Sequence, residues 1–221
     1  MLFDLRGKRR RAVQATYLTL AVLMGGGLVF FGIGGDVSGG LLDAFKGGGN
    51  NDSNVNSAVQ KRIDRNRERL RANPQSKPVL KELVRDEYGL ATAQTSSNST
   101  AFPKEARDEL RRSAAYWQRY LQAEKGEPDA DLGRVALQVY DVNALNKPKA
   151  AQNAAQIVAR ADNDAPSYLR LVQYSTLAKD KRTADLAAKK AVDLAPKADR
   201  ATVKQQAEQF KNPQALKPPQ G

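Results

Sequence analysis

Residues 165–196 read APSYLRLVQYSTLAKDKRTADLAAKKAVDLAP, and their apolar residues recur every three or four positions. This spacing indicates two amphipathic helices, over 165–178 and 182–194, because residues three or four apart share one face of a helix. Asp164 stands where an N-cap of the first helix is expected. The stretch is therefore predicted to fold as a helical hairpin.

The same periodicity extends over the rest of residues 54–211. No segment alternates between apolar and polar residues for long enough to indicate a strand, so the domain is predicted to be all-α. Prolines mark the expected helix starts, where the missing N–H is not needed; they are Pro74, Pro103, Pro128, Pro148 and Pro166. The further apolar stripes lie within residues 55–72, 80–91, 106–121, 132–140, 150–161 and 199–211.

The segment 165–196 resembles a tetratricopeptide repeat. It carries an early aromatic residue, a leucine one turn later, two small residues in the second helix and a closing proline (Tyr168, Leu171, Ala184, Ala191 and Pro196). Such a unit is too small to be stable alone and is expected to stack on its neighbours. The resemblance implies an α-hairpin repeat domain, and the alternative is a bundle of unrelated helical hairpins.

A second unit of the same shape is predicted upstream, over residues 131–161. Three of its residues stand 34 positions before counterparts in the first unit: Leu137, Tyr140 and Ala150 correspond to Leu171, Tyr174 and Ala184. The second half of the unit fits better with a shift of 33, which predicts a slip of one residue between its helices. Residues 76–124 are similar to a more divergent pair of the same kind.

Residues 12–33 are predicted to form a single transmembrane helix. These 22 residues carry no charge, and a helix of that length spans roughly 33 Å, enough for a hydrocarbon core of about 30 Å. A cleaved leader and a buried core helix are the alternatives. The basic residues that precede the span predict a cytoplasmic N-terminus and an extracytoplasmic domain; they are Arg6, Lys8, Arg9, Arg10 and Arg11.

The expected organisation has five parts. A basic cytoplasmic tail and the anchor are followed by a glycine-rich linker, the helical-repeat domain and a disordered tail, which occupy residues 1–11, 12–33, 34–53, 54–211 and 212–221. The protein is expected in the inner (plasma) membrane of a bacterium, crossing it once.

Composition excludes several kinds of chemistry. The chain has no cysteine and no histidine, so it has no thiolate nucleophile, no Ser-His pair and no zinc site of the Cys/His kind. No catalytic residue, metal or cofactor is expected. The net charge is +12, and +9 remains from residue 47 onward. Because the domain is expected to face outward, nucleic acid is not expected as a partner.

Three surfaces are candidates for binding. In the resemblance, the first helix of the clearest unit lines a groove for a peptide or partner helix, displaying Leu169, Arg170, Gln173 and Leu177. The segment 61–71, KRIDRNRERLR, indicates either a solvated face with ion pairs one turn apart or a contact with anionic lipid. In the aromatic cluster, Trp117 is expected in the core, whereas Tyr116 and Tyr120 could line a ligand groove.

Architecture gives the functional expectation. An anchor followed by repeats is similar to the anchored tetratricopeptide proteins of the YfgM type, which accompany protein export and envelope assembly. This resemblance implies a non-enzymatic module that binds other membrane or envelope proteins as an adaptor or chaperone-like factor. The alternatives are an envelope enzyme that uses carboxylates only, and a basic protein that binds a membrane surface or a polyanion.

Overall fold

The computed structural model shows the expected hairpin at residues 165–196. Helix α8 (Ala165–Leu177) runs into a tight turn and is followed by α9 (Lys181–Leu194), and the two helices pack against each other. Both begin at an aspartate whose side chain accepts a backbone N–H bond: Asp164 from Ser167 and Asp180 from Thr183. The predicted cap at Asp164 is confirmed.

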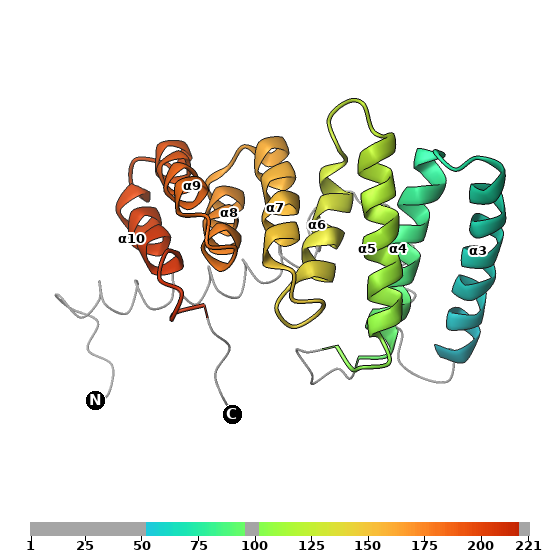
Figure 1. Cartoon of the computed structure of the whole chain (residues 1–221). Helices are drawn as coiled ribbons and strands as arrows, with labels where there is room; N and C mark the ends of the chain where they lie inside the picture. Colours follow the sequence, from blue (N-terminus) through green and yellow to red (C-terminus); the bar gives the residue numbers. More distant parts are fainter. Residues whose placement is uncertain (1–51, 96–101, 217–221) are drawn as a thin grey trace, which may run out of the picture. The chain divides into compact units, whose positions relative to one another are not determined.

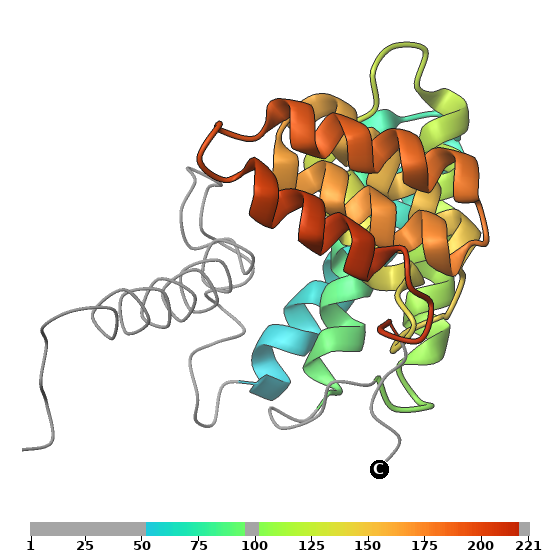
Figure 2. The ribbon, with the colours of Figure 1, turned by 90° about the vertical axis from the view of Figure 1, so that its left-hand side faces the viewer.

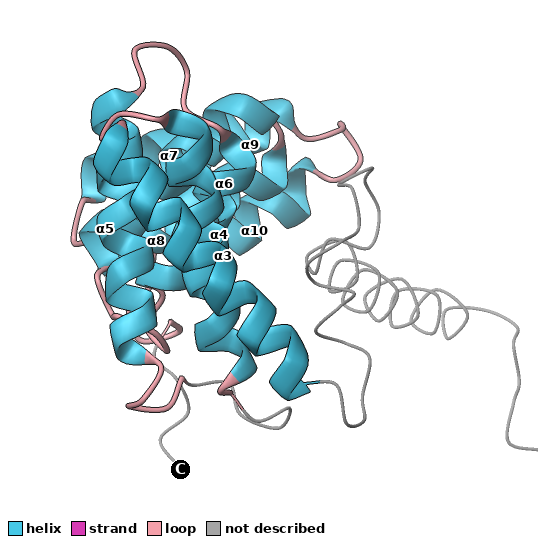
Figure 3. Ribbon diagram, turned by 90° about the vertical axis from the view of Figure 1, so that its right-hand side faces the viewer, coloured by secondary structure: helices cyan, strands magenta, loops and turns pink. Residues whose placement is uncertain are grey.

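The structure describes residues 52–95 and 102–216. Within these ranges there are helices and no strand, which confirms the all-α class (Figure 3). The first helix begins at Asp52, two residues before the predicted start of the domain. The helices besides α8 and α9 are α3 (Asp52–Ala72), α4 (Lys77–Ala93), α5 (Arg107–Ala123), α6 (Ala130–Tyr140), α7 (Pro148–Asp162) and α10 (Arg200–Phe210).

The helices follow one another in chain order from α3 to α10 (Figure 1). Most helices pack on the next one along the chain, and the remaining contacts join second neighbours: α4 with α6, and α8 with α10. Figure 2 shows α9 and α10 side by side at the C-terminal end of this row. Packing is therefore local in sequence, as in an array of stacked helix pairs.

The pairs α6–α7 and α8–α9 repeat each other residue by residue. In their first helices the shift is 34 residues, and both Leu137 and Leu171 are buried, at 1% and 4% exposure. In the second helices the shift is 33, since the fully buried Ala151, not the half-buried Ala150, matches Ala184. This agrees with the predicted slip of one residue, which falls in the turn between α6 and α7.

Small residues fill the contacts between neighbouring helices. Alanines on one face of α7 and α9 are buried, which lets the backbones of adjacent helices approach closely: Ala151, Ala154, Ala155 and Ala159, and Ala184, Ala187, Ala188 and Ala191. Gly133 of α6 serves the same purpose, because a Cβ there would lie 3.2 Å from Cγ2 of Val158 on α7. The large side chains lie mainly in α4 and α5, where Trp117 is 2% exposed, as predicted.

The aspartate that starts α9 also links two helix pairs. Besides its bonds to the backbone N–H and hydroxyl of Thr183, Asp180 accepts a bond of 2.7 Å from Nε2 of Gln152 on α7. The bonds from Thr183 and Gln152 lower the pKa of Asp180 to about 2. Asp199 occupies the N-cap position of α10 but makes no side-chain capping bond, so this predicted cap is only positional.

The turn between α8 and α9 contains a strained residue. Lys179 has φ of 61°, in the left-handed region that residues with a Cβ disfavour. We expect Lys179→Gly to raise the free energy of unfolding by about 0.5–1 kcal/mol, because glycine removes the strain but adds freedom to the unfolded chain. Urea unfolding followed by circular dichroism measures the change.

Asn146 provides the matched control for that substitution. It has φ of 50° in the equivalent turn between α6 and α7, and asparagine tolerates this region better than lysine does. Asn146→Gly should therefore gain less than Lys179→Gly. A Lys179→Gly protein no more stable than Lys179→Ala would contradict the strain.

The ends of the chain are only partly described. Among the described helices, none has the length and apolar character needed to cross a lipid bilayer. The predicted tail, anchor and nearly all of the linker, over residues 1–51, lie outside the described residues. The predicted disordered tail is corrected in part, because hydrogen-bonded turns continue from Asn212 to Ala215.

Candidate functional site

The basic segment 61–71 forms the C-terminal half of α3. Two of its ion pairs join residues one turn apart, as the solvated-face interpretation predicts: Arg67 to Asp64 at 3.3 Å and Arg71 to Glu68 at 2.7 Å. The side chains of Arg69 and Arg71 are 62% and 76% exposed. Contact of these exposed arginines with anionic lipid stays a prediction.

Other arginines of α3 neutralise buried carboxylates of α4, which the sequence interpretation did not anticipate. Arg62 donates from Nε and Nη2 to the two carboxylate oxygens of Asp86, at 2.8 and 2.6 Å. The side chain of Asp86 is only 3% exposed. The bidentate bond and the carboxylate charge raise the pKa of Arg62 against the effect of its partial burial.

Glu87 is the most enclosed charge of the described residues, with a side chain 0% exposed. Its Oε1 accepts from Nη2 of Arg67 on α3 at 2.8 Å, and its Oε2 accepts from Nε of Arg112 on α5 at 2.9 Å. A buried carboxylate is costly without a cation and hydrogen bonds. Glu87 therefore ties α3 and α5 to the helix between them, and it fixes the position of Arg67.

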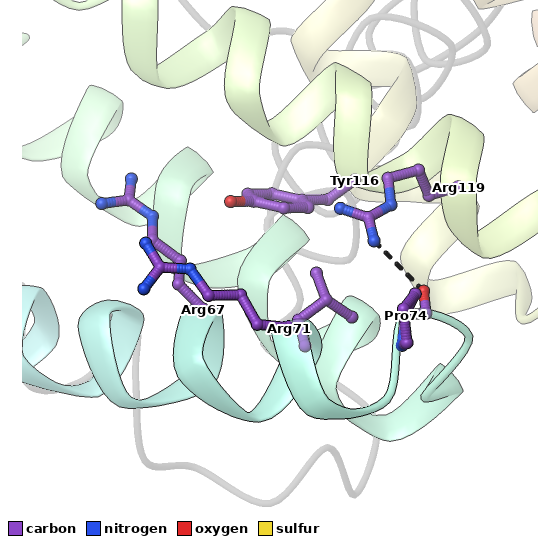
Figure 4. A pocket seen from close by; sticks show the side chains of 6 residues that line it. Arg67, Arg71, Pro74, Tyr116 and Arg119 are labelled. Carbon is purple, nitrogen blue, oxygen red and sulfur yellow. Dashed lines mark hydrogen bonds between the residues drawn. The ribbon is translucent and has the colours of Figure 1, made fainter.

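An open hollow of about 370 Å³ lies beside this network (Figure 4). The C-terminal part of α3 forms one side, the turn before α4 a second and α5 the third. The lining residues are Arg67, Leu70, Arg71, Pro74, Tyr116 and Arg119. Pro74 was predicted to mark the start of a helix, but it lies in the turn, and Pro78 occupies the first turn of α4.

Three guanidinium groups surround the hollow in different states. Arg67 is held by Glu87, and Arg71 pairs with an exposed glutamate. Arg119 donates to the carbonyl oxygen of Pro74 at 3.2 Å and makes no ion pair within the described part of the chain. Burial works to lower the pKa of Arg67, but the Tyr116 hydroxyl and the charge of Glu87 outweigh it, so that its pKa is raised.

The remaining lining is apolar or aromatic. Figure 4 shows the ring of Tyr116 between Arg67 and Arg119, with its hydroxyl directed toward Arg67. The side chains of Leu70 and Pro74 complete the wall. Arginines bind carboxylate or phosphate oxygens through paired N–H groups, and the ring and aliphatic carbons can cover an apolar group. The arrangement is thus suited to an oxyanion attached to an apolar group.

The aromatic cluster divides between this hollow and the core. Tyr116 lines the hollow, as one of the two interpretations of the sequence allowed. Tyr120 does not, because it is 1% exposed and stacks on Trp117 with ring centroids 5.6 Å apart. Its hydroxyl accepts a bond from the backbone N–H of Asp129. The groove alternative was therefore wrong for Tyr120.

The four predicted groove residues lie on α8, away from the residues of this hollow in the sequence. Leu169 is 8% exposed and belongs to the core, whereas Arg170, Gln173 and Leu177 are half-buried. Burial lowers the pKa of Arg170. A groove formed by these three side chains stays a prediction.

The other predicted site residues have no described position. The basic residues before the expected membrane span lie outside the described ranges; they are Arg6, Lys8, Arg9, Arg10 and Arg11. Over residues 52–95 and 102–216, no three carboxylate side chains gather as metal ligands.

Comparison with known proteins gives no match to a protein family, to a curated protein or to a solved structure. The functional argument therefore depends on this chain's own residues.

Proposed function

We propose that the chain is a helical-repeat module that binds other proteins and is held at a bacterial inner membrane by residues 12–33. The repeated burial pattern of α6–α7 and α8–α9 is the observation that carries this proposal. Two successive helix pairs with matching buried positions are typical of repeat arrays, whose stacked units present extended binding surfaces. The tetratricopeptide-like character of these pairs belongs to the same proposal.

The predicted anchor adds the location. An uncharged span of 22 residues after a basic cluster supports a single crossing with the domain outside the cytoplasm. A module in that place would meet membrane and envelope proteins, as an adaptor or an accessory factor in export or assembly.

A second candidate function is attachment of a basic face to anionic lipid or to a polyanion. The exposed arginines of α3 favour it, with Arg69 and Arg71 more than half exposed. Each basic residue near an anionic membrane surface contributes about 1 kcal/mol. Salt distinguishes the two functions, because charge attraction is screened within about 3 Å at 1 M salt, whereas apolar burial is not weakened by salt.

The test is photo-crosslinking of the full-length chain in intact membranes, with the crosslinker placed at Gln173 or Leu177. The module predicts discrete protein adducts that persist in 1 M salt. The same crosslinker at Leu186, which is 62% exposed on α9, serves as the control position.

The outcome that contradicts the module is specific. It is loss of all adducts at 1 M salt, together with loss of membrane-surface binding when Arg65, Arg69 and Arg71 are neutralised. That result would replace the protein-binding module with the basic surface.

A further inference from the structure

We propose that the hollow between α3 and α5 binds an acidic segment of a partner protein, in which a carboxylate stands next to an aromatic or aliphatic side chain. The inference rests on the proposed function and adds to it the place of contact and the chemistry of the partner. The hollow is distinct from the predicted groove on α8, since its lining comes from α3, the α3–α4 turn and α5.

The positive charge of the hollow is available to a ligand. Arg119 is held in place by the Pro74 carbonyl, a neutral acceptor, so the described residues leave its charge without a carboxylate. Arg71 pairs only with Glu68, whose side chain is 68% exposed. Such exposed pairs are weak, so an incoming carboxylate can displace Glu68 readily. Two guanidinium groups can thus bind one oxyanion.

Arg67 differs because it is already committed. Its bonds to Glu87 and its interaction with Tyr116 hold the guanidinium at the edge of the hollow before any ligand arrives. A preorganised group loses less conformational entropy when the ligand binds. Arg67 therefore shapes the hollow and adds to its field, while Arg71 and Arg119 provide the free donors.

The apolar wall selects among anions. Tyr116, Leu70 and Pro74 would remain in contact with water if only a small inorganic anion were bound. A segment that places an aromatic or aliphatic side chain on the Tyr116 ring buries this surface and gains from the hydrophobic effect. A volume of about 370 Å³ is near the lower limit of about 300 Å³ for ligand pockets, which suits one or two side chains.

A lipid headgroup fits these features less well than a peptide does. Its phosphate could bind the arginines, but its neighbouring glycerol and headgroup atoms are polar and would leave the apolar wall uncovered. A peptide presents its acidic and apolar side chains in adjacent positions and covers both parts together. The juxtaposition of free guanidinium groups with an aromatic wall therefore favours the peptide.

Fluorescence anisotropy with the full-length chain in a nonionic detergent tests the proposal. The probe is fluorescein-labelled Gly-Ser-Glu-Phe-Glu-Ser-Gly. One control peptide has glutamine in place of both glutamates, and the other has alanine in place of phenylalanine. We expect the probe to bind and each control peptide to bind about tenfold more weakly or worse, since each lacks one half of the recognition.

Variants of the protein locate the binding. Arg119→Gln and Tyr116→Ala should each weaken binding of the probe about tenfold. Arg111→Gln is the matched control, because Arg111 also lies on α5 but is 65% exposed, pairs with Asp108 and does not line the hollow. Circular dichroism verifies that each variant is folded, and Tyr116→Phe retains the ring where the alanine variant is not.

Three results would overturn the proposal. They are equal affinity for the three peptides, equal affinity of the Arg119→Gln and Arg111→Gln proteins for the probe, and no peptide binding while soluble dihexanoyl phosphatidylglycerol binds in an Arg119-dependent manner. Salt-resistant adducts at α8 that persist unchanged in Arg119→Gln would leave the proposed module intact. The failure of this inference is therefore distinguishable from the failure of the module.

Discussion

Replacing both Arg67 and Arg112 with alanine is expected to lower the free energy of unfolding by about 3–5 kcal/mol, because it leaves a buried carboxylate without a cation. Glu87 has no exposed side-chain surface, and each of its oxygens accepts from one of these two arginines, at 2.8 and 2.9 Å. Either single substitution should cost less than half of the total, since the remaining arginine still faces the charge.

The reverse substitution is expected to be milder. In Glu87→Gln, the amide keeps the size of the side chain, and the guanidinium groups of Arg67 and Arg112 can turn to water because they are 32% and 39% exposed. The asymmetry follows from burial, since the carboxylate cannot reach water and the cations can. Urea unfolding of all four proteins, followed by circular dichroism, gives the complete comparison.

Arg111→Ala is the control for loss of an arginine from α5. Its pair with Asp108 is exposed on both sides, at 65% and 70%, so the substitution should change stability by less than about 1 kcal/mol. A double Arg67 and Arg112 variant that loses no more than this control would show that Glu87 reaches water or binds a proton. The network would then not stabilise the contact between α3, α4 and α5.

Helical periodicity alone predicted the fold class and much of the core. The stripes on α5 and α8 placed Trp117 and Leu171 in the interior, and both are buried. The shift of 34 residues that becomes 33 also followed from the sequence, because alanines that pack against a neighbouring helix recur at fixed spacings. These features depend on contacts within a helix or between adjacent helices, which sequence spacing encodes directly.

The buried carboxylates were missed although the sequence carried their signal. Glu87 stands seven residues after Leu80 and three after Val84, so it falls on the same apolar stripe of α4. Charged residues were assumed to face solvent, and that assumption concealed the position. The spacing of the stripe, taken literally, predicts a buried glutamate that needs cations from the neighbouring helices.

The hollow could not be assembled from the sequence. Arg67 and Arg71 were noted as part of a basic segment, and Tyr116 as a candidate for a ligand groove. Their proximity depends on the relative position of α3 and α5, which α4 separates along the chain. Periodicity gives the face of each helix but not the register between two helices, so Arg119 and Pro74 were not connected with that segment.

The second large effect is expected at the repeat itself, where Leu171→Ala should lower the free energy of unfolding by about 2–5 kcal/mol. Leu171 is 4% exposed on α8, and its removal leaves a cavity that the surrounding alanine-lined contacts cannot fill without moving the helices. Urea unfolding measures the change.

Two further leucines decide whether the loss reflects the repeat. Leu137 occupies the matching position of α6 at 1% exposure, so Leu137→Ala should cost a similar amount, whereas Leu186 on α9 is 62% exposed. Leu186→Ala should change stability by less than about 0.5 kcal/mol, as surface substitutions do. A small loss at Leu171 beside a large loss at Leu137 would show that the two helix pairs are not equivalent in energy. The repeat would then describe the geometry of the chain but not its stability. Similar losses at both positions would mean that each pair contributes to the stack through the same buried leucine.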